Sequence, residues 1–112
     1  MKIALRYKGL PTSDGLTEFT TRRIHRHLSR FGQRIQAVEG RLSDVNGPRG
    51  GVDKRCMFTA TGPGIGSVRV EEVHQDFYGA VEQALGRLEH TVGRSVKRFR
   101  ERRGLVAQRR VS

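Results

Sequence analysis

The chain has 112 residues, of which 22 are Lys or Arg and 11 are Asp or Glu, so its formal net charge is +11. This length predicts one domain with one hydrophobic core, and no apolar run approaches the ~20 residues that span a membrane. The N-terminus lacks the apolar segment of a signal peptide and the single cysteine, Cys56, excludes an internal disulfide, so we expect a cytoplasmic protein.

The N-terminal part of the chain predicts a strand followed by a helix. Apolar and basic side chains alternate over residues 2–8, as in a half-buried strand, with Ile3, Leu5 and Tyr7 on one face and Lys2, Arg6 and Lys8 on the other. Ser13 or Asp14 is placed to cap a helix. On a helical projection at ~100° per residue, the apolar side chains of that helix form one stripe, which consists of Leu16, Phe19, Ile24, Leu28 and Phe31. Gly32 is predicted to end it.

Three further strands follow, over residues 34–45, 53–61 and 67–73. The glycine-rich segment 46–51 predicts a hairpin loop, and residues 62–66 predict a turn. The residues predicted to face the core are Val38, Leu42, Cys56, Phe58, Ala60, Val68 and Val70.

A long helix closes the chain. Asp76 is a good N-cap residue, and the helix that follows has a continuous apolar stripe of Phe77, Val81, Ala84, Leu85, Leu88, Val92, Val96 and Phe99. Beyond Phe99 the stripe is replaced by arginines, so the helix end must project past the sheet or fray. Gly104 is predicted to end the helix, which makes residues 1–103 the domain and residues 104–112 a flexible basic tail.

These elements predict an α+β fold with the order β-α-β-β-β-α. The last three strands are joined by short loops, so they should form an antiparallel meander. Each helix has one apolar stripe, so both helices should cover the same face of a four-stranded sheet. The other face would then present Lys, Arg, Thr and Glu side chains to water.

The charges of the long helix are sorted by sign. On a helical projection, Glu82 and Glu89 lie on one flank of the apolar stripe. Arg87, Arg94 and Arg98 lie on the other flank, and His90 and Lys97 lie further toward the outer face. Codon bias explains a preference for Arg over Lys, but it does not explain why acidic and basic side chains lie on opposite flanks of the apolar stripe. A plain solvated helix face is the alternative to a binding surface.

The first helix carries a similar row. Arg22, Arg26 and Arg30 are spaced by four beside the apolar stripe, and Arg23 lies near them. If the two helices pack side by side, the two rows could merge into one basic surface. Guanidinium groups match phosphate oxygens in pairs, so nucleic acid is the first candidate partner and an anionic membrane surface the second.

The sequence offers no enzyme site. His25 and His27 are two apart on a helix and cannot share a metal ion, and one cysteine cannot build a zinc site of ordinary spacing. Glu71 and Glu72 face opposite sides of a strand and do not form a catalytic pair. We expect no enzymatic activity, no cofactor and no small-molecule substrate. Glycines recur every seven residues on the outer face of the long helix. They either let a partner approach the helix backbone closely or simply reflect the high glycine content of the chain.

The run DFYGAVEQALGRLE, followed by a basic helix end, resembles the second helix of the ribosome hibernation-promoting factor and ribosome-associated inhibitor (sigma-54 modulation protein) family. The matching positions are Asp76, Tyr78, Ala80, Val81 and Glu82. The run LTEFTTRRIHRHLSRFG resembles the first helix, the element order agrees, and the resemblance covers about residues 1–100. Gly79 stands where the family often has a second alanine, and Arg stands where the family commonly has Lys.

The resemblance implies a fold similar to double-stranded-RNA-binding domains. It implies a translation inhibitor that occupies the mRNA and tRNA channel of the small ribosomal subunit during stress. On matching positions, the residues that would contact small-subunit rRNA are Arg22, Arg26, Arg30, Arg87, His90, Arg94, Lys97 and Arg98, with Arg23 beside them. Long members add a dimerisation domain, and we expect none in this short form.

Two alternatives stay open. One is a free RNA-binding module that reads duplex shape across the minor groove. The other is a protein-interaction regulator of transcription, which would use the exposed sheet face or the 46–51 loop. Binding to bare duplex RNA would favour the first, and a partner that survives nuclease treatment would favour the second.

Overall fold

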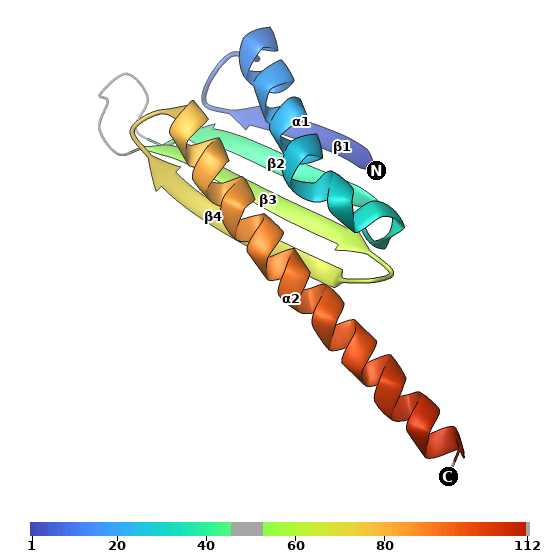
Figure 1. The fold of residues 1–112 in the computed structure, drawn as a ribbon. Coiled ribbons are helices and arrows are strands. Elements are labelled where there is room, and N and C mark those ends of the chain that lie inside the picture. The colour runs from blue at the N-terminus through green and yellow to red at the C-terminus, as the bar shows by residue number, and fades with distance from the viewer. Residues whose placement is uncertain (46–52, 112) are drawn as a thin grey trace.

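A computed structural model of the chain shows one four-stranded sheet with two helices on one of its faces (Figure 1). The structure describes the backbone of residues 1–45 and 53–111 and the side chains of residues 1–45 and 53–102. The elements are β1 (Lys2–Lys8), α1 (Asp14–Leu28), the short 3₁₀ helix η1 (Ser29–Arg34), β2 (Ala37–Asp44), β3 (Lys54–Gly62), β4 (Gly66–His74) and α2 (Phe77–Val111). The predicted α+β domain of order β-α-β-β-β-α is confirmed, whereas the predicted 46–51 loop lies outside the described residues.

The strands lie in the order β1-β2-β3-β4. β1 and β2 are parallel because α1 connects them across the face of the sheet, and the other two pairs are antiparallel, as the meander predicted. The register places core residues opposite one another, with Leu42 against Cys56 and Phe58 against Val70. At the β3–β4 turn Gly66 has φ 71°, a conformation that glycine adopts at low cost.

The core lies between the sheet and the two helices. Ile24 and Leu28 of α1, Phe58 of β3, and Leu85 and Leu88 of α2 are among its largest fully buried side chains. Each contributes roughly 1.5–3 kcal/mol through the apolar surface that it removes from water. All the strand residues predicted to face the core are buried, so the alternation in the sequence identified the inner face correctly.

Both helices begin with a side-chain cap. Ser13 Oγ accepts a hydrogen bond from the Leu16 amide at 3.2 Å, which selects Ser13 over Asp14 as the cap of α1. Asp76 Oδ1 accepts one from the Gly79 amide at 2.8 Å, as predicted for α2. Each bond satisfies an amide that would otherwise lack a partner at the first turn, and such caps contribute about 1 kcal/mol.

The ends of two predicted elements differ from the structure. α1 ends at Leu28, not at Phe31, and the chain continues as the η1 turn, in which Gly32 has φ 58° and breaks the helical path. β2 consequently begins at Ala37 and not at residue 34. Phe31 remains buried because the turn folds it back onto the core, so its apolar character did not distinguish an α-helix from a 3₁₀ turn.

The end of α2 also differs. Gly104 was predicted to end the helix, but the helix continues through it to Val111, because one glycine costs only about 1 kcal/mol relative to alanine in a helix interior. Figure 1 shows α2 running past the ends of the strands, which is the first of the two outcomes, projection or fraying, that the loss of the apolar stripe beyond Phe99 predicted. The separation of residues 104–112 as a flexible tail stays a prediction.

Candidate nucleic-acid interface

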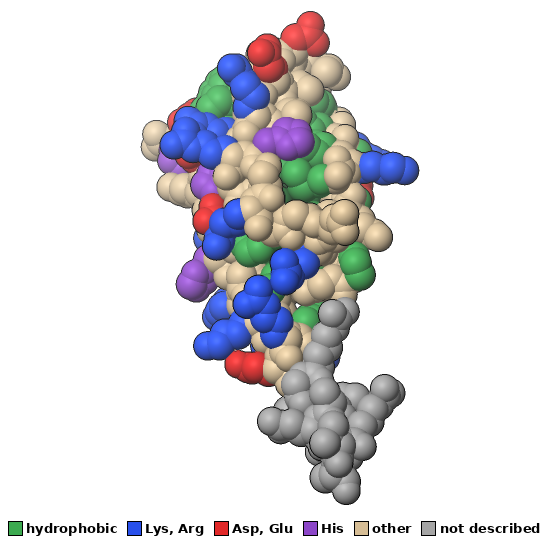
Figure 2. Space-filling view, turned by 45° about the vertical axis from the view of Figure 1, so that its right-hand side comes forward, with side chains coloured by type: hydrophobic (Ala, Val, Ile, Leu, Met, Phe, Trp, Pro, Cys, Tyr) green, Lys and Arg blue, Asp and Glu red, His purple; other side chains and the backbone are tan. Residues whose placement is uncertain are grey.

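The predicted binding residues lie on the outer surface of the helix layer, where α1 and α2 pack side by side (Figure 1). A space-filling view shows Lys and Arg side chains gathered on this part of the molecule, with histidines among them and few acids (Figure 2). All nine predicted residues have exposed or partly exposed side chains, and none is buried in the core; they are Arg22, Arg23, Arg26, Arg30, Arg87, His90, Arg94, Lys97 and Arg98.

The seam between the two helices is an ion-pair network. Glu82 and Glu89 of α2 face α1, with Arg23 Nε at 3.2 Å from Glu82 Oε1 and Arg30 Nε at 3.5 Å from Glu89 Oε2. His27 lies between the two acids, with Nδ1 at 2.8 Å from Glu89 Oε1 and Nε2 at 3.6 Å from Glu82 Oε1. The acidic flank of α2 therefore serves the packing of the helices against each other.

Two aromatic rings hold the seam arginines in place. The guanidinium carbon of Arg23 lies 5.3 Å from the centre of the Phe19 ring, and that of Arg30 lies 4.4 Å from the centre of the Phe31 ring. Such contacts between a cation and an aromatic face contribute ~0.5–1 kcal/mol at exposed sites. Arg23 and Arg30 are thus positioned by two partners each and keep part of their donor surface open.

The basic flank of α2 faces the other way, toward the edge of the sheet at β4. Arg87 Nη1 lies 2.5 Å from Glu72 Oε1 and 3.2 Å from the Glu71 carbonyl oxygen, while Arg98 donates to Ser95 Oγ at 3.2 Å. The α2 row therefore extends away from α1. The two rows do not merge into one, because the seam acids lie between them, although both are open to solvent on the same layer.

Five of the nine predicted residues have no ion-pair partner within residues 1–45 and 53–102, and these are Arg26, His90, Arg94, Lys97 and Arg98. Another cation of the α1 row, Arg22, pairs with Glu18 on its own helix at 3.6 Å, with both side chains about 70% exposed. Exposed pairs of this kind contribute roughly 0–1 kcal/mol, so they do not prevent an arginine from exchanging its carboxylate for a phosphate.

The three outer glycines of α2 differ in what surrounds them. A Cβ atom at Gly79 would lie 2.5 Å from the His74 ring, so the ring would have to move if this glycine were replaced. At Gly93 the nearest atoms are at ordinary contact distance, and at Gly86 there is nothing within 4 Å. Gly86 borders an open hollow of about 590 Å³ that is lined in part by Arg87, His90 and Arg94.

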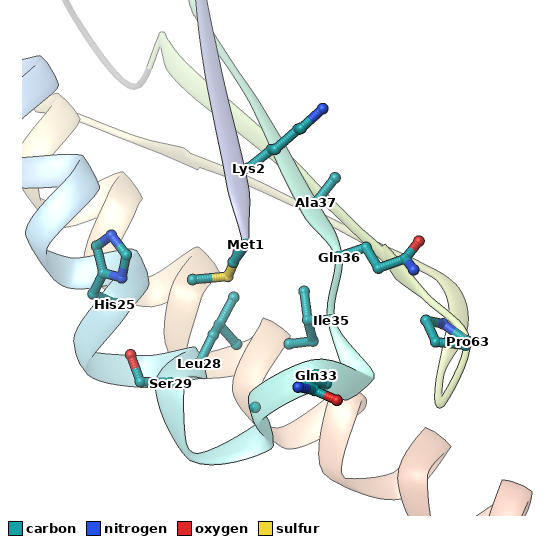
Figure 3. A pocket seen from close by; sticks show the side chains of 11 residues that line it. Met1, Lys2, His25, Leu28, Ser29, Gln33, Ile35, Gln36, Ala37 and Pro63 are labelled. Carbon is teal, nitrogen blue, oxygen red and sulfur yellow. The ribbon is translucent and has the colours of Figure 1, made fainter.

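A larger hollow of about 940 Å³ lies at the far end of α1, lined by residues of α1, η1, the start of β1 and the β3–β4 turn (Figure 3). Met1 points toward α1 there, whereas Lys2 points away from it. Leu28 and Ile35 contribute apolar walls, and the one histidine, His25, has no carboxylate or cysteine beside it in the lining. The hollow therefore offers no paired groups for acid–base or nucleophilic chemistry.

The described residues also show no metal site and no reactive thiol. They contain no cluster of three or more His, Cys, Asp or Glu side chains that could hold a metal ion. Cys56 is buried, and burial together with the nearby carboxylate of Glu72 raises the pKa of its thiol to about 12. No helix of the described chain is long and apolar enough to cross a membrane.

Comparisons with known proteins identify the family of the chain. Residues 3–103 match the family described as sigma 54 modulation protein / S30EA ribosomal protein. The chain belongs to this family. A crystal structure of the Protein Y N-terminal domain from Thermus thermophilus is 30% identical, with a TM-score of 0.69 over 84% of this chain and 98% of that one. No curated protein matches the chain significantly.

A second solved structure shows the same fold at lower identity. A ribosomal subunit interface protein from Coxiella burnetii is 19% identical, with a TM-score of 0.72 over 84% of this chain and 96% of that one. The sigma 54 modulation / S30EA family is a non-enzymatic, ribosome-associated family, so the expected absence of enzymatic activity and the resemblance seen in the sequence are confirmed.

In this member of the family, sequence reasoning missed which cations are paired. The projection of α2 separated the acids from the bases correctly, but it did not show that the acids face α1 and engage Arg23, His27 and Arg30. The signal was present in the α1 sequence, since a basic flank on one helix and an acidic flank on the next predict a seam when the two helices are neighbours.

Proposed function

We propose that the protein binds the small ribosomal subunit in the channel used by mRNA and tRNAs, and inhibits translation by occupying it. The observation that carries the proposal is the helix layer, on which Arg26, His90, Arg94, Lys97 and Arg98 face solvent without an ion-pair partner among the described residues. Membership of a ribosome-associated family supports the ribosome as the partner.

The physical basis of binding is electrostatic. Arginine presents a planar fork of donors that matches two phosphate oxygens at once. Because each phosphate that the protein neutralises releases condensed counterions, binding should weaken steeply with salt. Arg23 and Arg30 of the seam add to this surface through the part of their donor groups that stays open to solvent, while they remain paired with Glu82 and Glu89. No bond is made or broken, so inhibition follows from occupancy.

The test is sedimentation of the purified protein through a sucrose gradient with small subunits, with large subunits and with naked duplex RNA. We expect migration with small subunits and weaker binding to the other two. A preference for naked duplex would support the free RNA-binding module instead. A partner captured from nuclease-treated extract, with no binding to small subunits, would support the protein-interaction regulator.

Occupancy of the channel is tested by competition. Small subunits preloaded with mRNA and initiator tRNA should bind the protein more weakly than empty subunits do, and the protein added first should slow loading of both. Equal binding to loaded and empty subunits would place the protein elsewhere on the subunit. The variant Arg26→Gln/Arg94→Gln/Lys97→Gln should lose the effect, and the charge-preserving variant Arg26→Lys/Arg94→Lys/Lys97→Arg should keep most of it.

A further inference from the structure

Both helices lie on one face of the sheet and leave its other face open (Figure 1). This open face is also strongly basic. Six cations point outward from the four strands, and all six side chains are exposed: Lys2, Arg6, Lys8, Arg41, Arg55 and Arg69. Among the described strand residues, two carboxylates share this face, Glu39 and Glu71. The open face therefore has a formal charge of +4, and it lies on the opposite side of the sheet from the helix layer.

The two acids neutralise only part of this charge. Arg6 Nε lies 3.6 Å from Glu39 Oε1, and Arg55 Nε lies 3.0 Å from Glu71 Oε1, with all four side chains about half exposed or more. Arg69 contacts the Met57 sulfur atom and no carboxylate. In the described parts of the chain, Lys2, Lys8 and Arg41 have no ion-pair partner either.

The register of the β1–β2 pairing lowers the stability of the sheet at one position. Arg6 and Arg41 are direct partners in the β1–β2 pairing, so two like charges stand side by side on neighbouring strands. Opposed like charges destabilise a sheet. Within the described part of the open face, Glu39 offsets this repulsion only in part, through its pair with Arg6. An anion lying across β1 and β2 would be attracted by both arginines at once.

We propose that the open face of the sheet is a second binding surface for the sugar–phosphate backbone of RNA. Within the four described strands this face carries no aromatic side chain, since the residues between the cations are Ala, Ser, Thr, Met and Val. Sheets that read RNA bases do so by stacking the bases on aromatic rings. This face therefore fits phosphates and carries no means of reading sequence.

Two basic surfaces on opposite sides of one small domain cannot both touch the same straight duplex. The inference rests on the proposed function and extends it: the domain is inserted between two separate segments of rRNA, one against the helix layer and one against the sheet. A folded ribosomal crevice supplies both segments at once, whereas a free duplex supplies one. This would give the protein its preference for the intact subunit.

Cross-linking separates the two surfaces. A photoreactive residue at Thr59, near the centre of the open face, should cross-link to rRNA of the small subunit, and one at Gln83 on α2 should cross-link to a different rRNA segment. Cross-linking from Thr59 to a ribosomal protein only, or no cross-link from Thr59 while Gln83 reacts with rRNA, would overturn the second surface. Failure of the unmodified protein to bind small subunits at all would instead overturn the proposed function.

Affinity measurements provide a second test of the proposed binding surface. The variant Lys8→Gln/Arg41→Gln/Arg69→Gln removes three cations that have no carboxylate partner in the described structure. Its melting temperature should equal or slightly exceed that of the wild type, because Arg41→Gln also removes the like-charge contact with Arg6. At 0.1 M salt its affinity for small subunits should fall roughly eightfold for each phosphate that it no longer neutralises, while its affinity for naked duplex RNA stays unchanged. The charge-preserving variant Lys8→Arg/Arg41→Lys/Arg69→Lys is the control. Wild-type affinity of the Gln variant for subunits would contradict the inference.

Discussion

Replacing Gly86 by alanine should stabilise the protein. The added Cβ atom would have no neighbour within 4 Å, and the residue lies in the interior of α2, so the change gains helix propensity without a clash. Alanine is favoured over glycine there by about 1 kcal/mol. For a chain of 112 residues, with an unfolding entropy of ~2.1 cal/mol/K per residue, this corresponds to a rise in melting temperature of about 4 °C.

Gly79→Ala is the matched control, because it makes the same substitution on the same face of the same helix. Its Cβ atom would lie 2.5 Å from the His74 ring, and this ring also lies 3.3 Å from the amide and from a carboxylate oxygen of Asp76 at the helix start. Moving the ring would weaken both interactions and offset the gain in propensity.

Thermal unfolding followed by circular dichroism at 222 nm, with urea titration for the free energy of unfolding, should therefore rank Gly86→Ala above the wild type and above Gly79→Ala. A lower melting temperature for Gly86→Ala, or equal stabilisation by both substitutions, would refute this interpretation of the outer face of α2. Affinity of Gly86→Ala for small subunits should be retained, since the arginines beside it extend well beyond a methyl group.

Three further predictions concern single residues. Glu89→Gln removes the negative charge that His27 and Arg30 contact in the seam. The substitution should lower the free energy of urea unfolding by less than about 1 kcal/mol and should tighten binding to small subunits. Weaker binding to small subunits would contradict the role given to the seam. Asp76→Ala should lower the free energy of unfolding by about 1 kcal/mol through loss of the α2 cap, whereas Asp76→Asn should retain most of it. With a thiol pKa of about 12, Cys56 should be almost entirely protonated at pH 8 and resist iodoacetamide until urea unfolds the protein, so rapid labelling of the folded chain would be inconsistent with its burial.

Much of the fold followed from periodicity in the sequence. Alternation over residues 2–8 and around Phe58 identified the inner face of the sheet, and the spacing of Leu85 and Leu88 identified the buried stripe of α2. Helix ends were harder to predict because they depend on tertiary packing. Gly32 was recognised as a break, but the three residues before it leave the α-helix early and still bury Phe31, which no local pattern distinguishes.

The candidate interface was predicted less completely than the fold. Helical projection placed Arg94 and Lys97 on the solvent side, and the structure agrees. The pairing of Arg23 with Glu82 depends on how two helices pack, which projection of one helix does not contain. The charge of the open sheet face was visible as alternating basic residues in β1, but the opposition of Arg6 and Arg41 required the register of a parallel strand pair distant in sequence.

The central claim is that cations of the helix layer hold rRNA phosphates, and the salt dependence of binding tests it most directly. Affinity for small subunits should be measured across a series of KCl concentrations at fixed Mg²⁺ for the wild type and for Arg26→Gln/Arg94→Gln/Lys97→Gln. If all three side chains contact phosphates, the slope of log K against log[KCl] should become shallower by roughly 0.9 per phosphate, about 2.7 in total. Parallel lines for the two proteins would show that these side chains contact no phosphate, and the account would fail.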